Sequence, residues 1–301
     1  SPKSVAVVGG GVWCCSVIEQ LIKIGYKGTI FPVHPFKEEI LGIKSFKDLE
    51  DIPAIIDATF IGVNRNITIE VVKQLNCLNA GGAVCFASGF LEAEGDKQGS
   101  GELQKSLIEA AGDMPILGPN CYGFINYLDH SALWPDQHGG TTVDKGVAIL
   151  TQSSNIAINI TMQTRGLPIS YIMSVGNQAS LGFSEIGMYL LSDPRVTALG
   201  LHIEGIGDLK AFEELTTKAR KLGKPIVALK VGKSAEARRA AQSHTASLAG
   251  DAQSAKSLFK RLGIAEVDRL EVLIDTLKIF HSYGPVSVSY THLTLPTTRL
   301  V

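Results

Sequence analysis

The segment Ser243-His244-Thr245-Ala246 places a histidine between small side chains, which leave its imidazole ring reachable. Imidazole is a covalent nucleophile, and its near-neutral pKa keeps the neutral form available at physiological pH. A carboxylate beside the ring would fix its tautomer and stabilise a cationic adduct. Glu204, at the end of a predicted strand, is our candidate for that carboxylate, although an ordinary strand-end acid is the alternative. His202 shares its strand face, but its apolar neighbours favour a place in the core.

A glycine turn, Gly9-Gly10-Gly11, separates a β-branched run from a predicted helix. Glycines let the backbone approach a phosphate, and a helix N-terminus supplies unpaired N–H groups and a positive dipole end. The dinucleotide fingerprint is incomplete, because Cys14 stands at the third glycine position and the usual acid is missing further on. That later region contains Val33, Pro35 and Lys37, and the lysine suits the extra phosphate of NADP or coenzyme A. A tight turn without a ligand is the alternative.

Two further loops follow predicted strands, on the side where ligands bind in open α/β sheets. The first is Gly118-Pro119-Asn120-Cys121-Tyr122-Gly123, which a turn between domains also explains. The second is Thr151-Gln152-Ser153-Ser154-Asn155, which opens a predicted helix. Ser and Asn are strong N-caps, and the same helix start would also bind an anion. The helix alone does not choose between capping and binding.

Short β-branched runs alternate with amphipathic stretches, a pattern that predicts βαβ units and parallel sheets. The expected strands are Val5–Gly9, Thr29–Val33, Asp57–Gly62, Ala83–Ala87, Pro115–Gly118, Gly146–Leu150, Ile169–Val175, Ala198–Ile203 and Pro225–Val231. The expected helices are Cys15–Ile24, Ile67–Leu78, Gly101–Ala111, Asn155–Arg165, Phe183–Leu191, Leu209–Leu222 and Asp251–Leu262. We therefore predict an α/β fold of two tandem doubly wound domains.

The predicted domains cover residues 1–130 and 146–287, with a linker over 131–145. Residues 288–301 contain no Asp, Glu or Lys and have neither helical nor strand periodicity. They resemble the translated transposase adapter of DNA sequencing libraries, so we exclude this tail from the native fold. A natural C-terminal arm is the alternative.

The composition of the 301 residues excludes several classes of protein. Hydrophobic residues make up 45% and charged residues 19%, too little charge for a disordered chain. The net charge of −1 argues against nucleic acid and anionic membranes as main partners. No apolar run reaches the ~20 residues that span a bilayer, so we expect a soluble cytoplasmic protein. The five cysteines lack zinc spacing, so we expect no metal site and no disulfide framework.

Together these segments resemble the nucleoside-diphosphate-forming acyl-CoA synthetases, which include ADP-forming acetate–CoA ligase and the succinyl-CoA synthetase α subunit. The resemblance covers roughly residues 3–281. It implies a Rossmann-like CoA-binding domain and a flavodoxin-like ligase domain that carries a phosphohistidine loop. The implied roles are CoA binding by Gly9, Gly10, Gly11, Val33, Pro35, Lys37, Asn120 and Cys121, phosphate or acyl binding by Ser153, Ser154, Asn155, Gly176 and Asn177, and catalysis by Glu204 and His244.

The implied reaction is reversible and has three steps: phosphate displaces CoA from an acyl-CoA, His244 takes the phosphoryl group from the acyl phosphate, and ADP receives it. The implied ligands are coenzyme A, a small carboxylic acid, and ATP or ADP with Mg²⁺ on a nucleotide-grasp domain that these 301 residues do not include. We expect that domain on a partner subunit or on the same longer chain, and an oligomer in the full enzyme. Trp13, Tyr122 and the Ser154-Asn155 pair depart from the usual family pattern, so acetate is not assumed as the acyl group.

Two other functions stay open at this point. An NADP-dependent oxidoreductase is compatible with the glycine turn and Lys37, but it gives His244 and Glu204 no task. A non-catalytic CoA-sensing module is the second alternative, and the presence of His244 argues against it.

Overall fold

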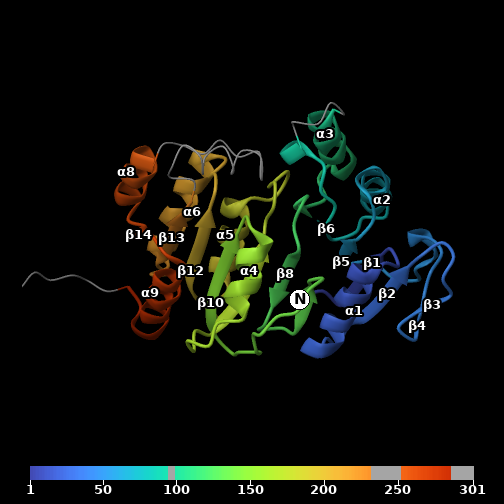
Figure 1. The fold of residues 1–301 in the computed structure, drawn as a ribbon, viewed down its shortest axis with the longest axis horizontal. Coiled ribbons are helices and arrows are strands. Elements are labelled where there is room, and N and C mark those ends of the chain that lie inside the picture. Colours follow the sequence, from blue (N-terminus) through green and yellow to red (C-terminus); the bar gives the residue numbers. More distant parts are fainter. Residues whose placement is uncertain (94–98, 232–251, 286–301) are drawn as a thin grey trace, which may run out of the picture.

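The computed structural model describes residues 1–93, 99–231 and 252–285, which form two α/β units side by side (Figure 1). In the first unit, five parallel strands lie in the order β2-β1-β5-β6-β7. Its elements are β1 (Ser4–Val8), α1 (Val12–Ile24), β2 (Thr29–Val33), β3 (Glu39–Ile40), β4 (Ile43–Lys44), β5 (Ala58–Ile61), α2 (Arg65–Cys77), β6 (Ala83–Cys85), α3 (Ser100–Ala111) and β7 (Ile116–Leu117), with short 3-10 turns η1 (Leu49–Asp51) and η2 (Leu91–Ala93).

The second unit contains a seven-stranded sheet in the order β14-β13-β12-β10-β11-β8-β9. Its elements are β8 (Gly123–Asn126), β9 (Ser131–Leu133), β10 (Gly146–Thr151), α4 (Ser154–Thr161), β11 (Ile169–Ser174), α5 (Phe183–Ser192), β12 (Val196–Ile203), α6 (Leu209–Lys221), β13 (Ile226–Lys230), α8 (Ala252–Leu262), β14 (Ala265–Val267) and α9 (Leu270–Tyr283). The strands β10 to β14 are parallel, whereas β8 and β9 pair antiparallel at one edge.

The parallel strands of both sheets follow the same order, 2-1-3-4-5 when they are counted along the chain. The prediction of two doubly wound α/β domains is therefore confirmed. In each sheet the order reverses beside the first strand, between β1 and β5 and between β10 and β12. Ligands of open α/β sheets bind outside the carboxyl ends of the strands at such a reversal.

Helices cover both faces of each sheet, which explains why β1 and β10 are buried along their whole length. Val5 and Val7 pack in one hydrophobic cluster with residues of α1, and the same cluster continues through Leu133 to Leu150. This shared core joins the two units into one body. Ala6 and Val8 pack on the other face, in the core that α2 and α3 complete.

The hairpin β8–β9 differs from the prediction, which contained no strand between residues 118 and 146. It extends the second sheet at β11, where Tyr171 pairs with Asn126. Residues 123–133 thus belong to that sheet, while the division of the chain at residue 130 stays a prediction. The elements β3, β4, β14 and α9 were also not predicted, and α4 ends at Thr161 instead of Arg165. The tail over 288–301 lies outside the described residues.

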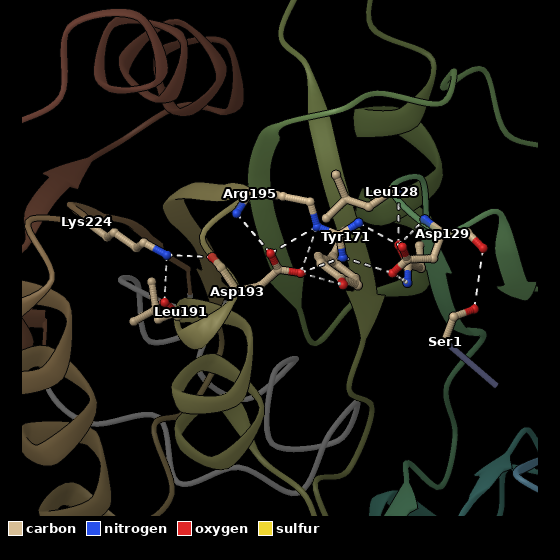
Figure 2. A network of polar contacts seen from close by, with 9 residues as sticks. Ser1, Leu128, Asp129, Tyr171, Leu191, Asp193, Arg195 and Lys224 are labelled. Carbon is tan, nitrogen blue, oxygen red and sulfur yellow. Dashed lines mark hydrogen bonds and ion pairs between the residues drawn. The ribbon is translucent and has the colours of Figure 1, made fainter.

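Arg195 connects the turn of the β8–β9 hairpin to the rest of the second domain, at the end of the sheet where β11 and β12 begin (Figure 2). Its guanidinium contacts the carboxylates of Asp129 and Asp193, each at 2.8 Å, and lowers the pKa of both acids. The Tyr171 hydroxyl donates to Asp193 at 3.4 Å, and Lys224 donates to the Asp193 carbonyl at 2.6 Å. The network therefore ties the β8–β9 turn to the end of α5 and the start of β12.

None of the helices in the described ranges combines the length and the apolarity that a bilayer crossing needs.

Candidate functional site

The start of α1 leaves open space beside the glycine turn. Gly11 is the N-cap, with no side-chain hydrogen bond, and a Cβ added there would meet nothing within 4 Å. At Gly10 the space is occupied instead, because a Cβ would lie 2.4 Å from the His34 ring. Lys37 reaches across the turn, and its Nζ donates to the Gly10 carbonyl at 2.7 Å. The Lys37 ammonium thus lies on the Gly10 side of the turn, and a cation near a helix N-terminus adds to its attraction for a phosphate group.

The other residues predicted around this turn are close to it. The Gly9 N–H donates to the Val33 carbonyl at 3.0 Å, which fixes the turn against β2. Pro35 is exposed and shares a surface hollow with Lys37. Cys14 fills the position of the missing third glycine, packing its Sγ against the Val8 and Gly62 carbonyls. Burial raises the pKa of this thiol to about 11, so it stays protonated.

A cavity of about 520 Å³ lies where the strands β5, β6 and β7 end. Its volume falls in the range of small-molecule and cofactor sites. The wall includes Asn120, Cys121 and Tyr122 from the loop after β7 and Ser154 from the start of α4. The structure thus brings three of the residues predicted for CoA, phosphate or acyl binding into one cavity.

Cys121 in this wall is a structural thiol. It is 1% exposed, and its Sγ lies 3.8 Å from the Cys85 carbonyl. Burial, together with the neighbouring Cys85, holds the pKa of Cys121 well above the usual range of a thiol. Since the thiolate is the nucleophilic form, Cys121 can line the cavity but is not poised to attack a substrate.

The start of α4 is built from hydroxyl side chains that already have partners. The Ser153 Oγ accepts from the Ile156 N–H at 3.4 Å, so Ser153 is the N-cap. The Ser154 Oγ accepts from the Tyr122 N–H at 3.2 Å and lies 2.7 Å from the Ser174 Oγ. Asn155 is exposed in the first turn. Ser153 therefore caps α4, which is one of the two predicted roles of this segment. The helix start also faces the cavity through Ser154.

Glu204 is buried beside the start of α4 and is held through its backbone. The Gln152 side-chain oxygen accepts from the N–H groups of Glu204 and Gly205, at 2.6 and 2.9 Å. The buried Lys230 donates to the Glu204 carbonyl at 2.9 Å. Sequence reasoning missed Lys230, because a lysine within a strand carries no motif. His244, the predicted partner of Glu204, lies outside the described residues.

His202 is buried at the end of β12, as predicted. Its Nδ1 lies 3.1 Å from the Thr151 Oγ1, and burial lowers the pKa of the imidazole to about 4. The ring is therefore neutral at physiological pH and supports the end of β10.

The loop after β11 joins the two domains. Gly176 adopts a positive φ of 52°, and a Cβ there would lie 2.2 Å from the Pro119 carbonyl oxygen. The Asn177 N–H donates to that Pro119 carbonyl at 3.0 Å. The Asn177 side-chain amide donates to the carboxylate of Glu92 and to Gln104 of α3. Asn177 thus holds this loop against the first domain, a role that its predicted place in an acyl site did not include.

In the parts of the chain that the structure covers, no cluster of three or more His, Cys, Asp or Glu side chains is arranged to hold a metal ion.

Two family models match the chain in order. Residues 3–127 match a CoA binding domain, and residues 144–280 match a succinyl-CoA ligase like flavodoxin domain. The two matches fall on the two units of the fold.

Similar proteins extend over both domains. The chain is 33% identical to a trans-feruloyl-CoA synthase of an unknown prokaryotic organism, over 92% of this chain and 40% of that protein. It is 32% identical to the α subunit of ADP-forming acetate–CoA ligase II of Pyrococcus furiosus, over 93% and 61% of the two chains. The solved structure of acetyl-coenzyme A synthetase 1 from Ca. Korarchaeum cryptofilum, in complex with phosphate and ADP, superposes with a TM-score of 0.83 at 27% identity, over 93% and 61%. The chain therefore spans about 40 to 61% of the length of these relatives.

Proposed function

We propose, from the premise that the chain belongs to the nucleoside-diphosphate-forming acyl-CoA synthetase superfamily, that it is the CoA-binding and phosphohistidine part of an acid–CoA ligase. The reaction converts an acyl-CoA, phosphate and ADP into a carboxylic acid, CoA and ATP, and it is reversible. One observation carries the proposal. A single cavity joins Asn120 and Cys121 of the CoA-binding domain to Ser154 at the start of α4.

CoA would bind along the first domain, with a phosphate group at the start of α1. The open side of Gly11 and the nearby ammonium group of Lys37 fit such a phosphate, because backbone N–H groups, the helix dipole and a cation each favour an anion at this helix start. Gly9 and Gly10 form the turn, and Val33 and Pro35 flank it. Asn120 and Cys121 then line the cavity for the thiol end of CoA.

Phosphate would bind at the start of α4, near Ser153, Ser154 and Asn155. A phosphate oxygen attacks the thioester carbonyl carbon, the C–S bond breaks, and the CoA sulfur leaves as a thiolate that takes up a proton. The product is an acyl phosphate. The helix start lowers the barrier by stabilising negative charge with preorganised N–H groups, and the loop of Gly176 and Asn177 keeps the two domains in register for the reaction.

His244 would attack the phosphorus of the acyl phosphate, forming an N–P bond while the carboxylate leaves. Phosphoryl transfer depends mainly on position and on stabilised charge, and Glu204 would supply both to the imidazole. The phosphoryl group then passes to ADP, held with Mg²⁺ by a nucleotide-grasp domain on a partner subunit or elsewhere in a longer chain. We place this reaction in the cytoplasm and expect an oligomer in the full enzyme.

A thiol assay tests this function against the NADP-dependent oxidoreductase. The chain is mixed with an acyl-CoA, and free CoA thiol is measured with and without orthophosphate. We expect thiol release only with orthophosphate, and tight binding of CoA but not of NADPH. Binding of NADPH without phosphate-dependent thiol release would support the oxidoreductase. Binding of CoA without release would support the non-catalytic sensing module.

A further inference from the structure

Three aromatic side chains meet beside the cavity, each from a different segment of the first domain. Trp13 lies in the first turn of α1, Phe86 follows β6, and Tyr122 follows β7. The ring centroids of Trp13 lie 5.5 Å from Phe86 and 6.0 Å from Tyr122, and those of Phe86 and Tyr122 are 5.6 Å apart. Every pair is tilted, by 45 to 52°, a geometry in which ring edges meet ring faces.

Within residues 1–93, 99–231 and 252–285, nothing fully covers the aromatic cluster of Trp13, Phe86 and Tyr122. Trp13 is 44% exposed, and Phe86 and Tyr122 are half-buried and line the cavity wall. Trp134 makes an edge-to-face contact with Tyr122, with ring centroids 5.5 Å apart, and is fully buried. The aromatic contacts therefore run from the core to the cavity, and they end in apolar ring surface that a bound ligand would remove from water.

The aromatic cluster lies next to both helix starts that we propose as anion sites, those of α1 and α4. Trp13 comes two residues after Gly11, so the helix start that would hold a CoA phosphate also sets the position of the indole ring. The Tyr122 N–H donates to the Ser154 Oγ at the start of α4. A thioester carbonyl that reacts with phosphate at α4 must therefore lie next to Tyr122, and its acyl substituent must lie along the same cavity.

From this juxtaposition we propose that the acyl group is aromatic, and that Trp13 and Tyr122 select aromatic carboxylic acids as the substrate class. The inference rests on the function proposed above. An aromatic ring placed against the cluster gains edge-to-face contacts in addition to its buried area. A two-carbon acyl group has no ring to place against the cluster, so it would gain no such contacts and would leave the exposed part of the indole in water.

Calorimetric titration of the full chain with phenylacetyl-CoA and acetyl-CoA tests the proposal, since the two thioesters differ only in the acyl group. We expect phenylacetyl-CoA to bind at least about tenfold more tightly, because contacts with two rings each contribute roughly two- to tenfold. In Trp13→Ala and Tyr122→Leu the affinity for phenylacetyl-CoA should fall about three- to tenfold, with under about twofold change for acetyl-CoA. Trp13→Phe and Tyr122→Phe keep a ring and should keep the preference.

Tyr283→Leu is the matched control, because Tyr283 is an exposed tyrosine on α9 and is absent from the cavity wall. It should leave both affinities unchanged. Equal affinities for the two thioesters in the unaltered chain, or equal losses for both in Trp13→Ala, would overturn the aromatic assignment. Phosphate-dependent release of CoA from acetyl-CoA would in that case still support the acid–CoA ligase. An aromatic preference without any CoA release would support the assignment and contradict the proposed reaction.

Discussion

The helices α1 and α4 occupy the same topological place, but their first turns are built from different residues. Each follows the first parallel strand of a sheet with the order 2-1-3-4-5. The start of α1 has Gly11 as its N-cap, with no side-chain bond and free space around it. The start of α4 has Ser153 as its N-cap, and Ser154 bonds to Tyr122 and Ser174.

The shared topology places both helix starts where an open α/β sheet can bind an anion. The residues at each start, Gly11 at α1 and the two serines at α4, set how much space an anion would have. Free space at Gly11 suits a phosphate that belongs to a large ligand. The hydroxyl groups of Ser153 and Ser154 at the start of α4 suit a small anion, which could replace one of their present hydrogen-bond partners. The contacts of Gly176 and Asn177 with the first domain then hold the second domain against it.

The largest effect that we predict is on CoA binding by Gly11→Asp. Gly11 has φ −80° and ψ 177°, which any residue adopts, so the new side chain fits the fold. Its carboxylate would repel the CoA phosphate, and the affinity measured by calorimetry should fall about 100-fold. The thermal midpoint should not fall, because Asp is a good N-cap. Gly11→Asn is the uncharged control and should lose less, and unchanged binding in Gly11→Asp would contradict a phosphate site at α1.

Next in size is the effect of Gly176→Ala on stability. The added Cβ would meet the Pro119 carbonyl oxygen, and φ is positive as well. We expect the free energy of unfolding, measured in urea, to fall by about 2–4 kcal/mol. Gly207→Ala has a similar positive φ but open space, so it should cost only about 1 kcal/mol. Equal losses of unfolding free energy at both positions would show that Gly176 is not tightly packed against Pro119 where the two domains meet.

The pH dependence of stability tests the support behind α4. Burial lowers the pKa of His202 to about 4, whereas an unfolded histidine titrates near 6.5. The unfolded chain therefore binds more protons between these values. The His202 contribution to the free energy of unfolding is complete above about pH 6.5 and falls by about 3 kcal/mol as the pH drops towards 4. His202→Gln should flatten this slope in urea denaturation. His138, whose pKa is also lowered to about 4 by burial, should keep its own share of the slope in that variant.

The smallest effect contrasts the two N-caps directly. Ser153→Ala should lower the free energy of unfolding by about 1 kcal/mol, because it removes the hydroxyl that caps α4. Gly11→Ser should instead raise it by a few tenths of a kcal/mol, approximately the advantage of serine over glycine as an N-cap. Changes of the same sign in thermal denaturation would mean that the two helix starts do not differ in the way that the structure describes.

The fold was largely predictable, because buried β-branched runs and amphipathic stretches alternate with regular spacing. The hairpin β8–β9 was not, since its strands are short and only β8 joins the sheet, at β11, which lies more than 30 residues further along the chain. A pattern within one segment does not reveal which distant strand will complete a sheet. The end of α4 was also misplaced, because Met162, Gln163 and Arg165 are compatible with a helix by residue type, whereas the helix ends at Thr161 with Met162 as its C-cap.

The candidate site was predictable where a motif carries it and not where tertiary contacts do. The turn Gly9–Gly11 and the serines after β10 were identified from residue type and place. The contact of Asn177 with Glu92 was missed, because it joins loops of two domains. The aromatic cluster gave two signals in the sequence, since Trp13 and Tyr122 both depart from the family pattern, but these rings and Phe86 meet only in the folded chain.

Locating a phosphoryl group on the chain tests the central claim most directly. The protein is incubated with an acyl-CoA and labelled orthophosphate, digested, and the labelled peptide is identified. We predict an acid-labile, alkali-stable label on the peptide that contains His244, absent in His244→Ala and retained in His202→Gln. A label that persists in His244→Ala would contradict the phosphohistidine and, with it, the reaction that we assign to this site.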